Sequence, residues 1–406
     1  MAVSDQAFDI TIIGGAMVGA ALACALRGKG WRIALVEGQP PQRDWPAGEV
    51  DLRVSALSRA SQRILERLGA WPRMRELGVS PYREMVVWDA VGRGSIHFDS
   101  ADIGEADLGH IVENRVTRLA LWEQLEQTPD VTLICPAAVQ SVEADEARAV
   151  VTLDDGRQIE TRLLVGADGR ESIVRSTLGI ACTSKAYDQR AIVANVEVGH
   201  WHRETAWQRF LPTGPLAFLP LADGRCSIVW SAEEHRANKL LALDDAAFSA
   251  ELEDAIERRL GPILSIGPRA SFPLRLQHAK EYVRPRAVLI GDAAHTVHPL
   301  AGQGVNLGFL DVAALADALD HARIKGRDIG SLHILRRYER ARRGDNAAML
   351  TAMDMFKHTF SNRNPAFAAA RSLGLFAADH IGPIKRVFME QAMGMSDALP
   401  PLARVG

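Results

Sequence analysis

Short apolar runs alternate with longer amphipathic stretches along the first third of the chain. Residues Phe8–Ile13 are apolar and rich in β-branched side chains, and they end at two glycines, which predicts a buried strand that stops at a tight turn. Val18–Gly28 is rich in Ala and Leu and predicts a helix, and Arg32–Glu37 is a second apolar strand that ends in an acid. The pattern predicts a βαβ unit with parallel strands.

The same strand pattern returns twice downstream. Leu163–Gly169 and Ala287–Asp292 are short apolar runs that end in Gly and Asp. Helices are expected near residues 116–125 and 305–322, and a loop followed by a helix is expected over Asp51–Gly69. Buried strands that alternate with helices are typical of an α/β fold.

A second region has a different pattern. Residues 186–275 are mostly strand-like, with one helix expected over about Asp244–Leu260, and they carry no dinucleotide turn. Tyr82–Asp99 also turns to strands, while 131–134 and 149–153 look like strands of a β-meander. We therefore expect a separate sheet that faces the substrate.

Composition narrows the class of protein. A chain of 406 residues suggests two or three structural units, and 47% hydrophobic with 24% charged residues is typical of a globular protein. The net charge of −3 gives no basic excess for wrapping a nucleic acid. Four scattered cysteines without zinc spacing argue against a disulfide scaffold and favour a reducing cytoplasm.

One uncharged segment, Ile10–Leu26, is 17 residues long, which is the lower edge for a membrane span. Asp5 and Asp9 precede it, no Lys or Arg does, and three glycines interrupt it. These features argue against a membrane span and against a signal peptide.

The turn between the first strand and helix reads Gly14-Gly15-Ala16-Met17-Val18-Gly19. It has the first and last glycines of the GxGxxG fingerprint, which allow the tight turn and close helix packing, and Ala16 replaces the middle glycine. Pyrophosphate would bind at the helix N-terminus, where free N–H groups attract anions. The added methyl predicts weaker binding of the phosphates. The alternative is a merely structural tight connection.

Carboxylates follow three of the predicted strands. Glu37 lies 23 residues after Gly14, where it can accept hydrogen bonds from a ribose diol, so FAD or NAD is expected rather than NADP. Asp168-Gly169 and Gly291-Asp292 place two more carboxylates where ligands bind in open α/β sheets. Either aspartate could instead only cap the following helix.

At three separated places the sequence resembles the p-hydroxybenzoate hydroxylase-like group of class A flavoprotein monooxygenases. The motifs are the fingerprint with Glu37, the segment Gly166–Arg175, and the segment Gly291–Pro299. Within that group it is most similar to the ubiquinone-biosynthesis hydroxylases, on the segments 298–311, 51–57, 108–114 and 335–340. The terminal Gln391-Ala392-Met393-Gly394 favours the member that hydroxylates C5 of a 2-polyprenylphenol.

The resemblance implies a Rossmann-like FAD-binding domain of the glutathione-reductase type, with an inserted mainly-β substrate domain and a C-terminal helical region. The corresponding domains are 1–80, 108–182 and 277–345 for FAD, 81–107 and 183–276 for the substrate sheet, and 346–406 for the C-terminal helices.

It also implies roles for individual residues. Glu37 would bind the adenosine ribose, Arg53 would lie near the flavin, and Asp168 would serve both FAD and nicotinamide. Gly291 and Asp292 would bind ribityl or ribose hydroxyls. The other implied positions are His298 and Pro299 beside the isoalloxazine; Gly302, Gln303, Gly304, Val305 and Asn306 at its pyrimidine edge; and Glu113 and Arg118 as further FAD contacts.

The implied chemistry belongs to the flavin. NAD(P)H would reduce FAD, O₂ would form a C4a-hydroperoxyflavin, and its terminal oxygen would pass to an electron-rich phenol ring. No catalytic side chain is therefore predicted, and NADPH is not distinguished from NADH. No metal is expected, because no Cys or carboxylate cluster completes the pair His295 and His298. The apolar segments Leu216–Leu221 and Ile228–Trp230 are predicted pocket walls.

Alternatives remain for function and partners. The same chemistry could act at another ring position, on a demethoxy-quinol or a methoxyphenol, and a non-hydroxylating flavin reductase or a FAD-binding scaffold is also compatible. A polyprenylated substrate suggests peripheral contact with the inner face of the membrane, and we expect residues after about Pro365 to help dock there or on a complex partner. A homo-oligomer is left open. The basic run from Arg336 to Arg343 predicts a solvated helix face.

Overall fold

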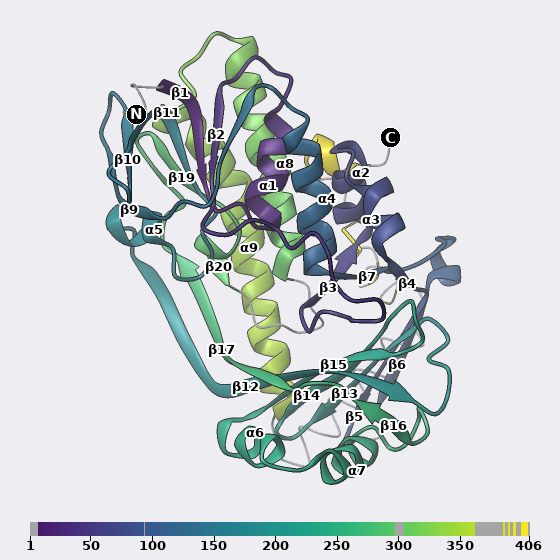
Figure 1. The fold of residues 1–406 in the computed structure, drawn as a ribbon. Coiled ribbons are helices and arrows are strands. Elements are labelled where there is room, and N and C mark those ends of the chain that lie inside the picture. The colour runs from purple at the N-terminus through teal and green to yellow at the C-terminus, as the bar shows by residue number, and fades with distance from the viewer. Residues whose placement is uncertain are drawn as a thin grey trace.

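The computed structural model describes residues 7–92, 94–296 and 304–361, together with 385, 389, 393–394 and 399–404. Two sheets organise these residues into a parallel-sheet domain, at the top of Figure 1, and an antiparallel-sheet domain below it. This confirms the predicted class, an α/β domain joined to a mainly-β domain.

The parallel-sheet domain is built on a sheet with the strand order β18-β19-β11-β1-β2-β8. Strands β19, β11, β1, β2 and β8 run parallel, while the short β18 is antiparallel to β19. Their bounds are β1 (Ala7–Ile13), β2 (Ile33–Val36), β8 (Val131–Ile134), β11 (Gln158–Gly166), β18 (Val283–Arg284) and β19 (Ala287–Leu289).

The expected meander is differently composed. It consists of β9 (Val139–Ala144), β10 (Ala149–Leu153) and β11, in which β10 pairs antiparallel with both β9 and β11. Strand β8 instead pairs in parallel with β2 at the far edge of the sheet. Placing β8 in the meander was therefore wrong. A crossover separates β8 from β9, and adjacency in the sequence does not reveal it.

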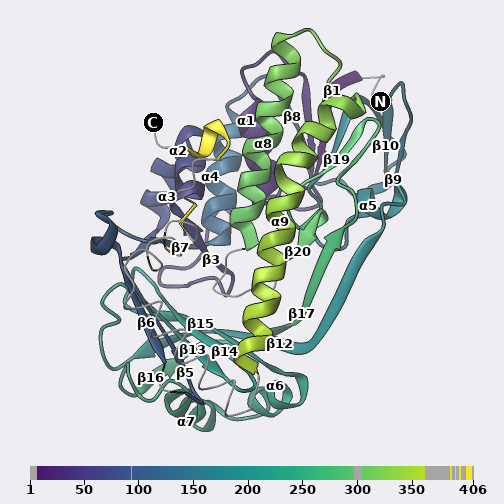
Figure 2. The ribbon, with the colours of Figure 1, turned by 180° about the vertical axis from the view of Figure 1, so that it is seen from behind.

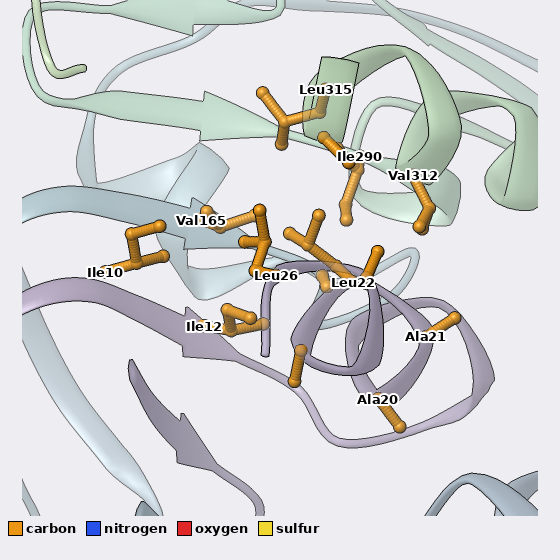
Figure 3. Close-up of a cluster of buried hydrophobic side chains, with 14 of the residues drawn as sticks. Ile10, Ile12, Ala20, Ala21, Leu22, Leu26, Val165, Ile290, Val312 and Leu315 are labelled. Carbon is orange, nitrogen blue, oxygen red and sulfur yellow. The ribbon is translucent and has the colours of Figure 1, made fainter. Parts of the chain in front are cut away.

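Four helices pack around this sheet: α1 (Met17–Leu26), α4 (Asn114–Glu126), α8 (Gly304–Ile324) and α9 (Leu332–Ser361). Helix α1 lies between the sheet, α4 and α8, so it is buried on nearly all sides, which explains its uniformly apolar sequence. Figure 3 shows Leu22 and Leu26 of α1 pointing toward Val165 of β11 and toward the side chains of α8. The uncharged segment Ile10–Leu26 is thus divided between β1 and α1.

Residues 51–58 do not form the expected loop throughout. Val54–Ser58 is β3, which pairs with β7 (Gly109–Glu113), and β7 also pairs with β4 (Ser80–Tyr82), so β3, β7 and β4 form a third sheet, called the small sheet below. Helix α2 (Arg59–Arg67) follows β3 directly, because the Ser58 hydroxyl accepts the Ser61 N–H as an N-cap. The short helix α3 (Trp71–Leu77) packs on α2 and α4, whereas the short helix α5 (Ile173–Thr177) lies away from them, beside β9 and β11.

The antiparallel-sheet domain has the order β20-β17-β12-β15-β14-β13-β5-β6, with β16 beside β12. The bounds are β5 (Glu84–Asp89), β6 (Ser95–Asp99), β12 (Cys182–Val198), β13 (Thr205–Leu211), β14 (Gly214–Pro220), β15 (Cys226–Glu233), β16 (Ile263–Ile266), β17 (Ala270–Ala279) and β20 (His295–Thr296). One face of this sheet packs on two helices, α6 (Glu234–Leu241) and α7 (Asp245–Ala255). The sequence predicted one helix, over about Asp244–Leu260, so α6 was not expected and α7 ends earlier than predicted.

Three long elements join the two domains. Strands β12 and β17 pair along their length, and α9 runs beside them down to β13 and β14 (Figures 1 and 2). Helix α9 continues through the predicted boundary at residue 345 without a break. No helix among the described residues is long and apolar enough to cross a membrane.

Candidate functional site

The carboxyl ends of four neighbouring strands bring the predicted nucleotide-binding residues together. The register pairs Ile13 of β1 with Val36 of β2 and with Gly166 of β11, and Gly166 in turn with Leu289 of β19. Gly14, Glu37, Asp168 and Asp292 follow these strand ends by one to three residues. Four motifs that are far apart in sequence therefore meet at one edge of the sheet, the usual ligand edge of an open α/β sheet.

The turn after β1 requires its glycines. Gly14 has a φ of +100°, and a Cβ there would lie 2.4 Å from the carbonyl oxygen of Ala167. At Gly15 an added Cβ would meet Glu37 and Trp122 at 2.9 Å, and at Gly19 it would lie 1.8 Å from the Gly14 oxygen. Each glycine thus allows a backbone approach that another residue would block.

Ala16 is the exposed N-cap of α1 and offers no side-chain cap to the helix. Its φ of −71° is ordinary for alanine, so the methyl group causes no backbone strain. The first N–H groups of α1 are consequently left for another acceptor, as a bound phosphate would require. Val18, in the first turn of α1, packs against Gly291 and Gly308, where an added Cβ would lie 3.2 and 2.6 Å from its methyl groups.

Glu37 already binds protein groups with both carboxylate oxygens. Oε2 accepts the Gly15 N–H at 2.6 Å, and Oε1 accepts the Gln39 N–H at 3.1 Å. The Arg118 guanidinium lies 3.5 Å from Oε1, and Arg118 also donates to the Gln39 carbonyl. A carboxylate has about four acceptor positions, so a ribose diol can still bind. Arg118 therefore lies beside Glu37, and its contact with FAD stays a prediction.

Asp168 behaves partly as a helix cap. Its carboxylate accepts the Ser172 hydroxyl at 2.6 Å and the Val174 N–H at 3.1 Å, at the start of α5. The buried Arg175 then ties α5 to the neighbouring turn, because it donates to the carbonyls of Ala293 and Arg170 at 2.8 and 2.7 Å. The alternative role for Asp168, capping of the next helix, thus accounts for the hydrogen bonds that its carboxylate accepts within the protein.

Asp292, unlike Asp168, is exposed and does not cap a helix with its side chain. It lies in a one-turn helix, η2 (Gly291–Ala293), and its side chain is exposed. Surrounding protein nevertheless raises the pKa of its carboxyl, against the lowering charges of His295, Arg53 and Arg170. A group that is open to solvent but crowded by protein lies in a recess. The exposed Arg53 guanidinium has no hydrogen-bond partner among the described residues.

Helix α8 begins at Gly304. Of the predicted positions at the flavin's pyrimidine edge, the structure describes Gly304, Val305 and Asn306. Asn306 is the most informative of these. Its buried side chain binds protein: Oδ1 accepts the Ser58 N–H and the Ser61 hydroxyl, and Nδ2 donates to the Ala56 carbonyl. Asn306 therefore fixes the start of α8 against β3 and α2, and Val305 follows Gly304 in the first turn. His298, Pro299, Gly302 and Gln303 lie outside the described residues.

Glu113 binds the segment that precedes Arg53. Its carboxylate accepts the Asp51 N–H at 2.6 Å and the Arg115 Nε–H at 2.8 Å. The Arg53 carbonyl accepts the Asn114 N–H at 2.9 Å. Glu113 thus positions the backbone that carries Arg53, and its predicted direct contact with FAD stays a prediction.

A buried ionic cluster lies behind Asp292. Asp311 of α8 is fully buried; its Oδ2 lies 2.5 Å from His295 Nε2 and accepts the Gly291 N–H at 3.0 Å, and its Oδ1 accepts the Arg342 Nε–H at 2.9 Å. Asn346 bonds both Arg342 and Asp311. Burial alone would raise the pKa of the Asp311 carboxyl, but His295 and Arg342 outweigh it and lower that pKa to about 2. The cluster anchors the turn that carries Asp292.

Arg342 corrects one expectation. The basic run was predicted to be a solvated face, but the Arg342 side chain is only 5% exposed and pairs with Asp311. Tyr338, Arg342 and Asn346 recur at helical spacing on α9 and face the protein interior. The number of charges in the run could not predict that Arg342 is buried. The helical spacing of the apolar residues Leu335 and Tyr338 could have indicated which face of α9 is buried.

A narrow, mostly apolar cavity lies between the small sheet and the antiparallel sheet. It is bounded by Ala56, Tyr82 and Ile111 of the small sheet and by Gln208, Ala217 and Leu219 of the antiparallel sheet, with Met85, Ala206 and Trp207 completing the wall. Of the predicted pocket wall Leu216–Leu221, Ala217 and Leu219 border this cavity, and that the substrate binds there stays a prediction. In the second predicted wall, Ile228–Trp230, Ile228 and Trp230 pack toward α6 and α7 and do not border the cavity, because side chains alternate along a strand.

Gln208 and Arg175 were missed by sequence reasoning. Arg175 closes the motif Gly166–Arg175, so its position was visible although its role was not. Gln208 has no local signature. Among the described residues no group of three metal-ligating side chains occurs.

A family model and the sequences of known proteins place the chain in the same family. The model of the FAD binding domain family matches residues 7–352. A ubiquinone hydroxylase, UbiL, of Rhodospirillum rubrum is 41% identical over 96% of this chain and 90% of its own length. The 3-demethoxyubiquinol 3-hydroxylase of Escherichia coli is 38% identical over 97% of this chain and its full length.

Solved structures share the fold at lower sequence identity. The p-nitrophenol 4-monooxygenase PnpA of Pseudomonas putida superposes with a TM-score of 0.79 at 18% identity, covering 96% of this chain and 98% of that one. The residues at the strand ends fit FAD: the uncapped N-terminus of α1 suits its pyrophosphate, Glu37 a ribose, and the recessed Asp292 further hydroxyls.

Proposed function

Because the chain belongs to the FAD-dependent monooxygenases of ubiquinone biosynthesis, we propose that it hydroxylates the aromatic ring of a polyprenylated phenol, using NAD(P)H and O₂. The position that we propose for the new hydroxyl group is C5 of a 2-polyprenylphenol. The flavin, once reduced, supplies the oxygen activation, which no amino-acid side chain can provide.

One observation carries the proposal: an apolar cavity adjoins the same small sheet that holds the start of α8. Ala56 lines the cavity with its side chain and accepts Asn306 with its carbonyl. The cavity has room for about one water molecule, so it would take one substituent of a ring that lies next to it, near the helix end that is assigned to the flavin. Apolar walls suit a prenylated ring and exclude water, which would otherwise waste reducing equivalents as peroxide.

The chain's own residues have positioning roles in this proposal. The first turn of α1 and Glu37 hold the adenosine diphosphate part, and Asp292 binds hydroxyls closer to the flavin ring. Arg53 places a positive charge near Asp292 and is free to face an anionic group. The first-turn N–H groups of α8 point along the helix dipole, so they stabilise negative charge that develops on a reduced flavin.

The C-terminal segment supports the choice of ring position. Met393, from the motif that resembles the C5 hydroxylases, is buried in one apolar cluster with the cavity residues Ala56, Tyr82 and Leu219. Its carbonyl accepts the Ala60 N–H at 3.2 Å, and Gly394, with a φ of +66°, allows close packing on Ala60. A segment in this place can shape how the ring enters.

A second candidate is hydroxylation of a demethoxyubiquinol. It is favoured by the relative from Escherichia coli, which carries that substrate in its name and matches nearly the whole chain. Both reactions need the same site and differ in the ring substituents.

The test starts from the FAD-loaded protein under anaerobic conditions. It is mixed with NADPH or NADH, with and without 2-geranylphenol, and loss of the oxidised flavin absorbance is followed. We expect the phenol to accelerate reduction and O₂ to yield a hydroxylated product whose structure gives the ring position. A matched run uses the demethoxyubiquinol with a short prenyl chain.

Different results would favour the rivals. Rapid reduction that yields only peroxide with every phenol would favour a flavin reductase. Bound flavin that neither nucleotide reduces would favour a FAD-binding scaffold. Product from the demethoxyubiquinol alone would replace the C5 assignment with the second candidate.

A further inference from the structure

Gln208 is a buried amide without a partner. The residue is 5% exposed, its buried Oε1 has no hydrogen bond, and no hydrogen bond of its Nε2 is found among the described residues. Leaving a buried polar group unsatisfied typically costs about 1–3 kcal/mol, so native proteins rarely do so without a reason.

The strand geometry directs Gln208 toward the cavity. Along β13, Arg209 faces α7 and donates to the Ala255 carbonyl at 2.8 Å, and Trp207 packs against the apolar cluster on the same side although it also borders the cavity. Gln208 lies between them and therefore points to the opposite face, the one turned toward the parallel-sheet domain. It pairs with Ala217 of β14, and both residues line the cavity.

The Gln208 amide lies in a mostly apolar environment. Around it the cavity is walled by Ala56, Ile111 and Leu219, and Tyr82 carries the one side-chain hydroxyl among the described residues of the wall. Burial raises the pKa of the Tyr82 phenol, so that group stays protonated and neutral. The free space is about the size of one water molecule. Such a recess suits one oxygen substituent of a ring, and a whole ring needs further room beside it.

We propose that Gln208 recognises the substrate by a hydrogen bond between its amide and an oxygen substituent of the aromatic ring, and so determines specificity and ring orientation. This proposal rests on the proposed function. An amide both donates and accepts, so it can bind a phenol hydroxyl in either sense. A site built to bind a hydroxyl rejects the analogue that lacks it, because the amide is then left unpaired.

The experiment measures binding, with no turnover. The FAD-loaded wild type and Gln208→Leu are titrated with 2-geranylphenol and with geranylbenzene, which lacks the hydroxyl, and changes in the oxidised flavin absorbance report binding. The control is Gln189→Leu. Gln189 is also buried in this sheet with an unpaired Oε1, but it donates to the Thr213 carbonyl and does not line the cavity.

We expect the wild type and Gln189→Leu to prefer the phenol about tenfold or more, and Gln208→Leu to bind both compounds almost equally. Gln208→Met, with a longer apolar side chain, should behave like Gln208→Leu and guards against a folding defect in one variant. An unchanged preference in both Gln208 variants would mean that the amide holds only a water molecule, and the inference would fall. A wild type that binds no phenol would instead overturn the proposed function itself.

Discussion

His110 shows how a single buried residue couples folding to pH. Its ring is largely buried, packs edge-on against Trp71 with ring centres 5.0 Å apart, and lies 3.7 Å from Asp107. Burial, aided by the charges of Arg59 and Arg75, lowers its pKa to about 4. The unfolded chain has a histidine pKa of about 6.5, so it binds a proton that the folded chain rejects between these values.

Stability should therefore fall as the pH drops from about 6.5 to about 4, with His110 contributing on the order of 3 kcal/mol at most. His110→Phe keeps the contact with Trp71 and removes the titration, so the free energy of unfolding should depend less on pH in this window. Urea unfolding at several pH values measures this. His235→Gln, at an exposed position on α6, is the control. Parallel pH profiles for wild type and His110→Phe would contradict the prediction.

At the scale of elements, Asp311 links α8, α9 and the Gly291–Asp292 turn. Asp311→Asn keeps the shape of the side chain but leaves Arg342 without its buried counter-charge, because its other acidic partner, Asp345 at 3.3 Å, is exposed. Removing one partner of a buried ion pair typically costs about 3–5 kcal/mol. The Gly291 N–H loses a charged acceptor as well, so FAD binding should weaken together with stability.

The matched control is Asp317→Asn on the same helix. Asp317 is partly exposed and its carboxylate lies 3.8 Å from Arg337, so this substitution should cost less than about 1 kcal/mol. Thermal unfolding and FAD titration of both variants make the comparison. Equal stability of the two variants would show that the cluster does not anchor the turn.

The strand ends could be predicted from the sequence because each motif is local. Gly14, Glu37 and Asp168 follow apolar runs that predict their own strands, and parallel order then brings them together. Residues whose environment comes from distant chain could not be predicted. Strand β3 exists because Leu57 pairs with His110, Arg342 is buried because Asp311 lies on another helix, and Gln208 meets a cavity whose other wall is Ala56.

At the scale of the whole molecule, the C-terminal segment returns to the core. Met389 and Met393 are buried against the cavity residues, while Leu399 and Ala403 are buried in the parallel-sheet domain, beside the short helix η4 (Pro401–Ala403). Truncation after Pro365 would remove all four. Losing one large buried side chain typically costs about 2–5 kcal/mol, so a truncated protein would not give a clean test of membrane docking.

Point substitutions in the full chain test the docking hypothesis more cleanly. The apolar stretch Phe367–Ala378, which lies outside the described residues, is the predicted contact with a lipid surface. We expect Phe367→Ser with Phe376→Ser to reduce flotation with vesicles of phosphatidylethanolamine and phosphatidylglycerol, because each buried aromatic ring contributes about 1.5–3 kcal/mol to insertion. The variant must retain FAD and the thermal stability of the wild type. Equal flotation of the two proteins would mean that this stretch makes no membrane contact, which would contradict the docking hypothesis.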